Sequence, residues 1–286
     1  MTRPLTRYVA APADAAIARR RIALGTLGSF GALGLAGLLG CGGGSDGSSG
    51  TMDSGGGTDT SGGSGTGTGT SQTCSVVPEE TAGPYPADGS SASNASYNVL
   101  ALSGIVREDI RKSIGASGNV DGVPLSISIT LTGTRSGCAA LAGYAVYLWH
   151  CSQEGNYSVY TERSIAANYL RGVQVTDAAG TVTFTTVVPG CYAGRMPHMH
   201  LEIYPSLALA TTASNSVKTT QLAFPTDTLA AIYAAQPGYS ASVRNLASMS
   251  FATDNVFSDG TELQMTTMAS DGSGGYTATA AISIAA

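Results

Sequence analysis

The sequence predicts an all-β domain, built as an antiparallel sandwich or barrel, that follows an N-terminal export segment and a flexible linker. Short stretches with alternating or β-branched side chains recur between Gly, Asp and Ser clusters, and few stretches have helical periodicity. Strands at this spacing, without helices between them, are typical of antiparallel sandwiches and barrels. The domain spans residues 73–286, which is long enough for one substantial core.

The predicted strands each occupy a short run with β-branched or alternating residues, at 126–131, 145–149, 182–187, 199–203 and 276–284. A helix is predicted at 226–235, because capping residues precede it and Pro237-Gly238 follows it. The sequence Asp177-Ala178-Ala179-Gly180 predicts a hairpin turn between a strand at 174–175 and the strand that begins at 182.

Residues 1–41 have the features of an export signal. Five arginines and one acid precede an uncharged apolar run at 22–40, which ends at Cys41. The alternative is an anchoring transmembrane helix, which needs about 20 apolar residues. Leu38-Leu39-Gly40-Cys41 resembles a lipobox, which implies a lipid on Cys41, and Arg19-Arg20-Arg21 resembles a twin-arginine signal. We expect an exported protein on the periplasmic or cell-surface side, with only this lipid anchor in the membrane.

Residues 42–72 are nearly all Gly, Ser, Thr and Asp, a composition that predicts a disordered tether. Beyond residue 40, nine Lys and Arg face eighteen Asp and Glu, a net charge of −9. An acidic domain with few bases is poorly suited to bind nucleic acid, so no nucleic-acid partner is expected. The sequence leaves the oligomeric state open.

Four cysteines follow the linker, at Cys74, Cys138, Cys151 and Cys191. An even number in an exported domain suggests two disulfides, for which three connectivities exist. Cys138 and Cys151 flank a loop and a strand that could fold back on each other, so we favour this pair, which leaves Cys74 with Cys191. The alternative is that these cysteines are buried free thiols.

His198-Met199-His200 holds two of the chain's three histidines. On a strand their imidazoles share a face, so they could bind a metal or form hydrogen bonds in a core. A turn at Pro189-Gly190 would let Tyr192 fold back towards them, and Tyr157 follows the strand that ends at Trp149. Arg195 places a fixed cation nearby, where it could stabilise an anion.

Two tyrosines and two histidines favour one particular ion. A free tyrosine has a pKa of about 10 and is neutral at pH 7. Only a strongly Lewis-acidic ion deprotonates it, as metals do to bound water. The donor set therefore predicts non-haem Fe(III), rather than Mg²⁺, Ca²⁺ or Zn²⁺.

Several motifs follow one another within residues 74–221. These motifs are Pro78-Glu79-Glu80-Thr81-Ala82-Gly83-Pro84-Tyr85, Arg107-Glu108-Asp109-Ile110-Arg111, Asp121-Gly122-Val123-Pro124-Leu125, Val146-Tyr147-Leu148-Trp149-His150-Cys151, Gly155-Asn156-Tyr157-Ser158, Leu170-Arg171-Gly172-Val173-Gln174-Val175-Thr176-Asp177 and Pro189-Gly190-Cys191-Tyr192-Ala193-Gly194-Arg195 before His198-Met199-His200. In these motifs and in their order the chain resembles the intradiol ring-cleavage dioxygenases, the family of catechol and protocatechuate 3,4-dioxygenases.

This resemblance implies the family's β-sandwich and its iron site. Tyr192 and His200 match the axial ligands of Fe(III), and Tyr157 and His198 match the equatorial ligands. Arg195 matches an arginine that stabilises the activated substrate, Gln221 matches a glutamine behind the ligands, and Tyr85 matches a residue of the substrate pocket. The implied reaction cleaves a catechol-type aromatic diol with O2 to a cis,cis-muconate-type product.

Two other functions compete with this interpretation. One is a non-catalytic, exported ligand-binding sandwich. The other is an Fe(II) oxygenase in which Glu202 joins His198 and His200 on one strand face, a reading that leaves both tyrosines unexplained. His150 and Trp149 are expected to be structural.

Overall fold

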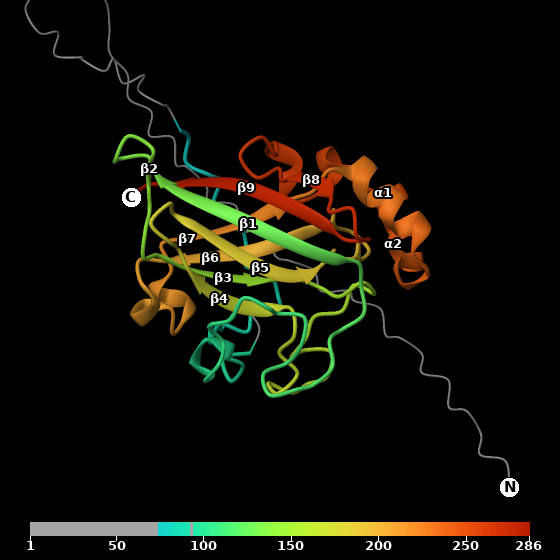
Figure 1. Cartoon of the computed structure of the whole chain (residues 1–286), viewed down its shortest axis with the longest axis horizontal. Helices are drawn as coiled ribbons and strands as arrows, with labels where there is room; N and C mark the ends of the chain where they lie inside the picture. Colours follow the sequence, from blue (N-terminus) through green and yellow to red (C-terminus); the bar gives the residue numbers. More distant parts are fainter. Residues whose placement is uncertain (1–73, 92–93) are drawn as a thin grey trace, which may run out of the picture. The chain divides into compact units, whose positions relative to one another are not determined.

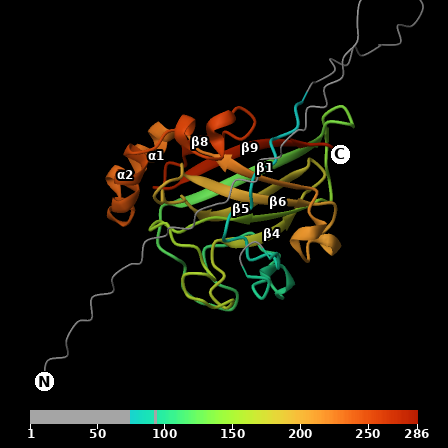
Figure 2. The ribbon, with the colours of Figure 1, turned by 180° about the vertical axis from the view of Figure 1, so that it is seen from behind.

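The structure is a computed structural model that describes residues 74–91 and 94–286. In this part of the chain two β-sheets pack face to face, and two α-helices lie together at one end of the strands (Figures 1 and 2). The predicted export segment 1–41 with Cys41, and the predicted linker 42–72, lie outside the described residues.

The first sheet has five strands and the second has four. In the five-stranded sheet the order is β2-β1-β9-β8, and β5 also pairs with β1; the strands are β1 (Pro124–Gly133), β2 (Ala139–Ala140), β5 (Thr181–Val187), β8 (Thr267–Ser270) and β9 (Tyr276–Ile284). The four-stranded sheet has the order β4-β3-β6-β7, from β3 (Ala145–Trp149), β4 (Arg171–Val175), β6 (His198–Tyr204) and β7 (Lys218–Ala223).

The sequence pattern of β1 explains how the five-stranded sheet is placed. Its alternate apolar residues are buried against the other sheet (Leu125, Ile127, Ile129, Leu131). Its other face carries hydroxyls, and those of Ser128 and Thr183 lie 2.9 Å apart across the β1–β5 pair. Cross-strand hydroxyl pairs of this kind stabilise a sheet face that is not in the core.

The four-stranded sheet is buried on both faces. Every residue of β3 and β6 is buried. One face contributes Leu148 and Leu201 to the core between the sheets. The other face carries Tyr147, Trp149 and Tyr204, which pack with residues from the segment before β1 and the segment after β3. This second face, covered by loops, also receives the histidines of β6.

All five predicted strands are confirmed, and so is the β-sandwich. One pairing differs from the antiparallel expectation, because β1 and β9 run parallel. The other pairings between named strands are antiparallel.

The predicted hairpin at residues 177–180 is wrong. The turn itself exists, since the Gly180 amide donates a hydrogen bond to the Asp177 carbonyl at 2.9 Å. However, β4 before the turn pairs with β3, whereas β5 after it pairs with β1. The turn therefore links the two sheets. Turn chemistry is local, but the partner of a strand depends on which sheet buries its apolar face.

The predicted helix is confirmed as α1 (Thr226–Ala235), which buries Leu229, Ile232 and Tyr233 along one stripe. A second helix, α2 (Ser240–Ala247), was not predicted. Of its eight residues only Ser242 is buried, so this helix lacks the stripe of buried apolar residues that α1 has.

The two predicted disulfides, Cys138–Cys151 and Cys74–Cys191, are wrong. The structure joins Cys74 to Cys138, with Cα atoms 5.8 Å apart, and leaves Cys151 and Cys191 as buried free thiols. Cys138 lies in the turn after β1, whereas Cys151 follows β3 in the other sheet, so the strand between them does not fold back within one sheet. The alternative, that these cysteines are buried free thiols, is confirmed for Cys151 and Cys191.

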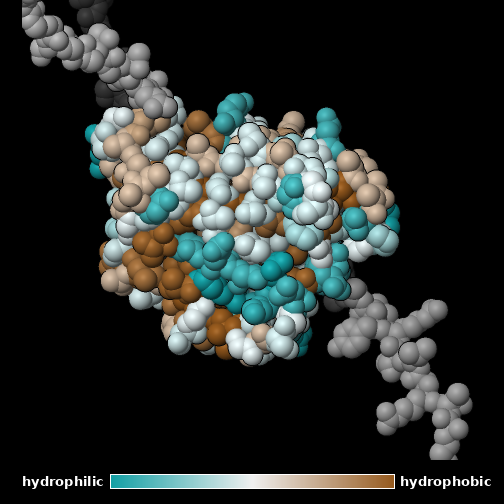
Figure 3. Space-filling model, viewed as in Figure 1, coloured by the Kyte–Doolittle hydropathy of each residue, from teal (hydrophilic) through white to brown (hydrophobic). Residues whose placement is uncertain are grey.

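The surface of the described residues is mixed in character. On the face shown in Figure 3, a hydrophilic area lies just below the middle of the molecule, with an apolar area to its left. Tyr85 is one of the large apolar residues that stay exposed, at 38%.

No helix in residues 74–91 and 94–286 is long and apolar enough to cross a membrane.

Candidate active site

The two histidines of β6 lie on the loop-covered face of the four-stranded sheet. His198 is 1% exposed and His200 is 3% exposed. They share this face, as strand alternation predicts, and their ring centroids are 4.7 Å apart. His200 is flanked in the sheet by Trp149 of β3 and Gln221 of β7, so the neighbouring strands fix its position.

Two phenols reach these histidines from separate loops. The Tyr157 Oη lies 3.3 Å from the Nε2 atoms of both His198 and His200. The Tyr192 Oη lies 3.2 Å from His198 Nε2, and the two Nε2 atoms are 3.1 Å apart. Four donor atoms from three segments therefore converge on one point, and these are the four residues that the sequence indicated.

The loops that carry the two tyrosines pack against each other at Gly190 and Gly155. The Gly190 amide donates a hydrogen bond to the Ser152 carbonyl at 3.1 Å, and a Cβ at Gly190 would lie 2.7 Å from that oxygen. Gly155 has φ 86°, and a Cβ there would lie 3.0 Å from the Cβ of Tyr192. The close approach of the loops thus requires glycine at both positions.

Without a bound metal, burial keeps the two imidazoles and the two phenols neutral. His198 Nδ1 donates to the Met196 carbonyl at 2.6 Å, so the lone pair of its Nε2 is directed at the cluster. Burial lowers the pKa of His198 to about 3, and lowers the pKa of His200 well below its usual value. Burial also raises the pKa of Tyr192 to about 12, and that of Tyr157 well above its usual value.

This donor set fits a metal ion of high charge. Ligands held about 2.1 Å from an ion and about 90° apart lie about 3 Å from each other. The 3.1–3.3 Å separations among the four atoms match that spacing. The imidazoles offer lone pairs at neutral pH, whereas the phenols ionise only beside a strongly Lewis-acidic cation.

The alternative site of His198, His200 and Glu202 is wrong. Glu202 shares the strand face, but its carboxylate accepts a hydrogen bond from the Tyr204 hydroxyl at 2.6 Å. Burial, followed by the neighbouring Asp88 carboxyl, raises the pKa of Glu202 well above its usual value. Among the residues that the structure describes, no group of three or more His, Cys, Asp or Glu side chains could hold a metal.

Arg195 is held beside the cluster by two side chains. Its Nε donates to both carboxylate oxygens of Asp254, at 3.2 and 3.0 Å, and its Nη2 donates to the Gln221 Oε1 at 2.7 Å. Asp254 is fully buried, which opposes its ionisation, but a hydrogen bond from the Met196 amide and the charge of Arg195 keep its pKa below the usual value. The predicted cation is therefore present and immobilised.

Tyr85 lies at the edge of the cluster, and its place in a substrate pocket stays a prediction. Its ring stacks on Tyr157, with centroids 4.9 Å apart. The segment that carries Tyr85 is tied to the site, because Gln221 Nε2 donates to the Thr81 carbonyl at 2.8 Å. This segment covers the side of the histidines next to β7.

Sequence reasoning missed the roles of Trp149 and Asp254. Trp149 was expected to be structural; it is fully buried and also stacks on His200, with centroids 4.8 Å apart and planes that differ by 6°. A prediction that β3 pairs with β6 would have placed Trp149 beside His200 and indicated this contact. Asp254 lies in no motif, so no sequence signal was available.

His150 is structural, as predicted. Its Nδ1 donates to the Cys151 carbonyl at 2.8 Å, and its Nε2 accepts from the Thr186 hydroxyl at 2.7 Å. It hydrogen bonds with none of the four convergent side chains.

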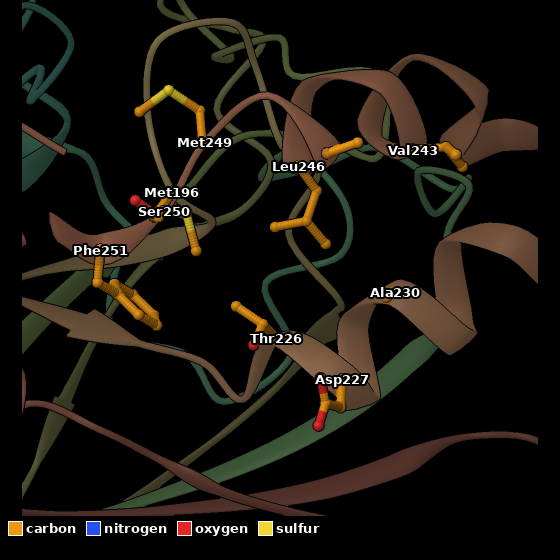
Figure 4. A pocket seen from close by; sticks show the side chains of 10 residues that line it. Met196, Thr226, Asp227, Ala230, Val243, Leu246, Met249, Ser250 and Phe251 are labelled. Carbon is orange, nitrogen blue, oxygen red and sulfur yellow. The ribbon is translucent and has the colours of Figure 1, made fainter. Parts of the chain in front are cut away.

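A hollow of about 490 Å³ lies away from the four donor atoms, between α1 and the segment 243–251 (Figure 4). Leu246, Phe251 and Met196 point into it, and Asp227 is its one charged side chain. None of the four donor atoms lines this hollow. The convergence of reactive groups, and not the size of a cavity, therefore locates the active site.

Known proteins match the chain over most of this domain. A family model described as dioxygenase matches residues 111–264, just over half of the chain. An intradiol ring-cleavage dioxygenase from Tetranychus urticae superposes with a TM-score of 0.56 at 25% identity, covering 74% of this chain and 94% of that one. The dioxygenase domain of a carbohydrate-binding fusion from Streptomyces sp. SirexAA-E matches with a TM-score of 0.45 at 22% identity, over 73% and 98% of the chains. Comparison with curated proteins finds no match.

Proposed function

The chain belongs to the intradiol ring-cleavage dioxygenase family, and from this premise we propose that it binds Fe(III) and cleaves a catechol-type aromatic diol with O2. The proposed product is of the cis,cis-muconate type. The observation that carries the proposal is the convergence of two phenol oxygens and two imidazole nitrogens, each of which lies within 3.3 Å of at least one other. This combination suits a ferric ion better than any common divalent ion.

Tyr157, Tyr192, His198 and His200 would hold the iron. Two phenolates and two neutral imidazoles would offset two of its three charges, and burial favours such partial neutralisation. When bound, ferric iron supplies the Lewis acidity that ionises the phenols and the catechol and accepts electron density from the ring.

Tyr192 is the phenol suited to move a proton. Its side chain is less buried than that of Tyr157, and its hydroxyl contacts one imidazole where the Tyr157 hydroxyl contacts two. We assign its Oη as the acceptor of a proton from a substrate hydroxyl. Tyr157, held more tightly, keeps its position.

Arg195 would stabilise the negative charge that develops on the ring. Asp254 and Gln221 orient the guanidinium before the substrate arrives, so no reorganisation is needed during the reaction. Its Nη1 makes no hydrogen bond with the described residues and remains available to an anion. The segment over β7, with Tyr85 at its end, would help to exclude water.

Tyr157→Phe tests the ligand set. The purified iron-loaded protein should show a visible phenolate-to-iron band, and the variant should lose or strongly shift it together with oxygen uptake on catechol. Tyr276→Phe, on β9 away from the site, is the matched control and should change neither. An unchanged band in Tyr157→Phe contradicts the assignment. Iron-loaded protein that consumes no O2 with any catechol would favour the non-catalytic alternative.

We also propose export with a lipid anchor on Cys41, because a basic and then apolar segment precedes this cysteine. Cys41→Ser should move the protein from the membrane fraction to the soluble fraction. Retention of the variant in the membrane fraction would count against the anchor.

A further inference from the structure

A second cleft of about 250 Å³ opens beside the proposed iron ligand Tyr157. It is lined by Tyr85, Gly155, Asn156, Tyr157, Tyr160 and Thr161. Cavities of about 150 Å³ are known to hold one benzene ring. This cleft therefore has room for one aromatic ring in addition to the catechol ring that would bind at the cluster of Tyr157, Tyr192, His198 and His200.

Tyrosine rings continue from the buried cluster along this cleft to the surface. Tyr85 stacks on Tyr157 at 4.9 Å, and the edge of Tyr160 follows at 5.2 Å from Tyr85. Tyr97 then meets Tyr160 at 5.4 Å. Rings at these spacings present faces and edges to which another aromatic ring can stack.

The wall formed by Tyr160 is rigid. Its hydroxyl accepts a hydrogen bond from the Ala87 amide at 2.9 Å, and the buried guanidinium of Arg171 lies 5.7 Å from its ring centroid. Arg171 is itself fixed, because it donates to the carbonyls of Pro86 and Ser158 at 2.9 and 3.0 Å. The wall therefore keeps its shape without a ligand.

The backbone between the iron ligand and this wall is strained. Val159 has φ 73°, a left-handed conformation that a β-branched residue rarely adopts. Val159 lies between Tyr157, which contacts the cluster, and Tyr160, which lines the cleft. Such strain persists where the surrounding structure enforces it, and it is concentrated at functional sites.

The polar groups of the cleft suit a neutral, hydroxylated ring. None of the six lining residues is an Asp, Glu, Lys, Arg or His. The Asn156 amide and the Thr161 hydroxyl are exposed, and no hydrogen bond of the described residues uses either side-chain group. They can bind phenolic hydroxyls, whereas a carboxylate would find no cation among the lining residues.

We propose that the preferred substrates are catechols that carry a second, neutral, hydroxylated aromatic ring. The catechol ring would occupy the iron cluster and the second ring would lie in the cleft, against the rings of Tyr85 and Tyr160 that line it. This inference rests on the proposed function and specifies the substrate class of the same site.

The test compares kcat/KM for three substrates: catechol, catechol with a para-hydroxyphenyl group, and catechol with a carboxylate. The hydroxyphenyl compound should exceed catechol by about tenfold, since the second ring would contact the rings of both Tyr85 and Tyr160, and the carboxylate should give no gain. Tyr160→Ala and Thr161→Trp, which remove the wall and fill the cleft, should each bring this ratio near one. Tyr160→Phe keeps the ring and should keep the ratio.

Thr161 is exposed, so Thr161→Trp remains informative if Tyr160→Ala does not fold. A wild-type ratio of one or less, or a ratio that survives both variants, would overturn the inference and leave the proposed function intact. Binding of dihydroxybiphenyl, measured by ligand-observed NMR, needs no turnover and should weaken about tenfold in Thr161→Trp. If this binding is equal in both proteins the cleft proposal fails, whereas cleft binding without oxygen uptake on any catechol contradicts the proposed function alone.

Discussion

Trp149 lies flat against His200, with ring centroids 4.8 Å apart and planes that differ by 6°. The other proposed histidine ligand is oriented differently, because His198 Nδ1 donates to the Met196 carbonyl. His200 Nδ1 is buried and has no hydrogen-bond partner among the described residues. In most metal-binding histidines a hydrogen bond from the second ring nitrogen sets the plane of the ring. In His200 the stacking on Trp149 sets it instead.

Trp149→Phe should weaken iron binding by about tenfold, the lower end of the effect of residues that orient metal ligands. The indole Nε1 is itself buried without a partner, so the change removes no hydrogen bond. Competition with an iron chelator measures the affinity. Phe184→Leu removes a buried ring from the other sheet and should lower the melting temperature without changing iron affinity. Equal affinities in wild type and Trp149→Phe would contradict the role.

Asp254→Asn should lower kcat by about 10- to 100-fold, with a smaller change in KM, because Arg195 loses the carboxylate that orients it. Asp254 makes none of the contacts within the cluster of phenols and imidazoles, so the visible band should stay in place. Steady-state kinetics and an absorption spectrum check both points. Asp259→Asn, at an exposed neighbour, is the control. A shifted band would mean that Asp254 acts on the iron ligands themselves.

His150→Gln should flatten the dependence of stability on pH below neutrality. Burial lowers the pKa of His150 to about 4 from the ordinary 6.5. As the pH falls from 6.5 to 4, the unfolded chain binds a proton that the folded protein does not, so the free energy of unfolding decreases. Removing this histidine should reduce the slope by about 1 kcal/mol per pH unit in this window. Urea unfolding at several pH values measures it, and parallel curves for the two proteins would contradict the assignment.

Loss of the Cys74–Cys138 disulfide should lower the free energy of unfolding by about 2–4 kcal/mol, because the bond closes a long loop, with a sequence separation of 64. Cys74→Ser, Cys138→Ser and the double variant should be equally destabilised, since all three remove one bond. Peptide mapping without reduction should recover the Cys74–Cys138 pair. A linked peptide that contains Cys151 or Cys191 would contradict the structure.

Several features were predictable because their causes are local. The alternation of His198 and His200 places both rings on one strand face, whichever sheet that strand joins. The turn at Gly190 brings Tyr192 back because only glycine permits that approach. The chemistry of phenols and imidazoles, together with motif order, then indicated the kind of ion.

Other features depended on which segments become neighbours, and sequence patterns do not carry that information. The turn at 177–180 was recognised, but only the burial of β4 and β5 in different sheets shows that it links them. The same placement separates Cys138 from Cys151 and brings Cys74 to Cys138.

The sequence by itself determined the strands, the four donor residues and the cation at Arg195. Tertiary structure decided that Asp254 orients that cation, that Trp149 sets the plane of His200, and that Tyr85 and Tyr160 frame a cleft beside Tyr157. The physical reason is that a donor atom's chemistry belongs to its residue, whereas its orientation and surroundings come from long-range pairing that buries apolar surface.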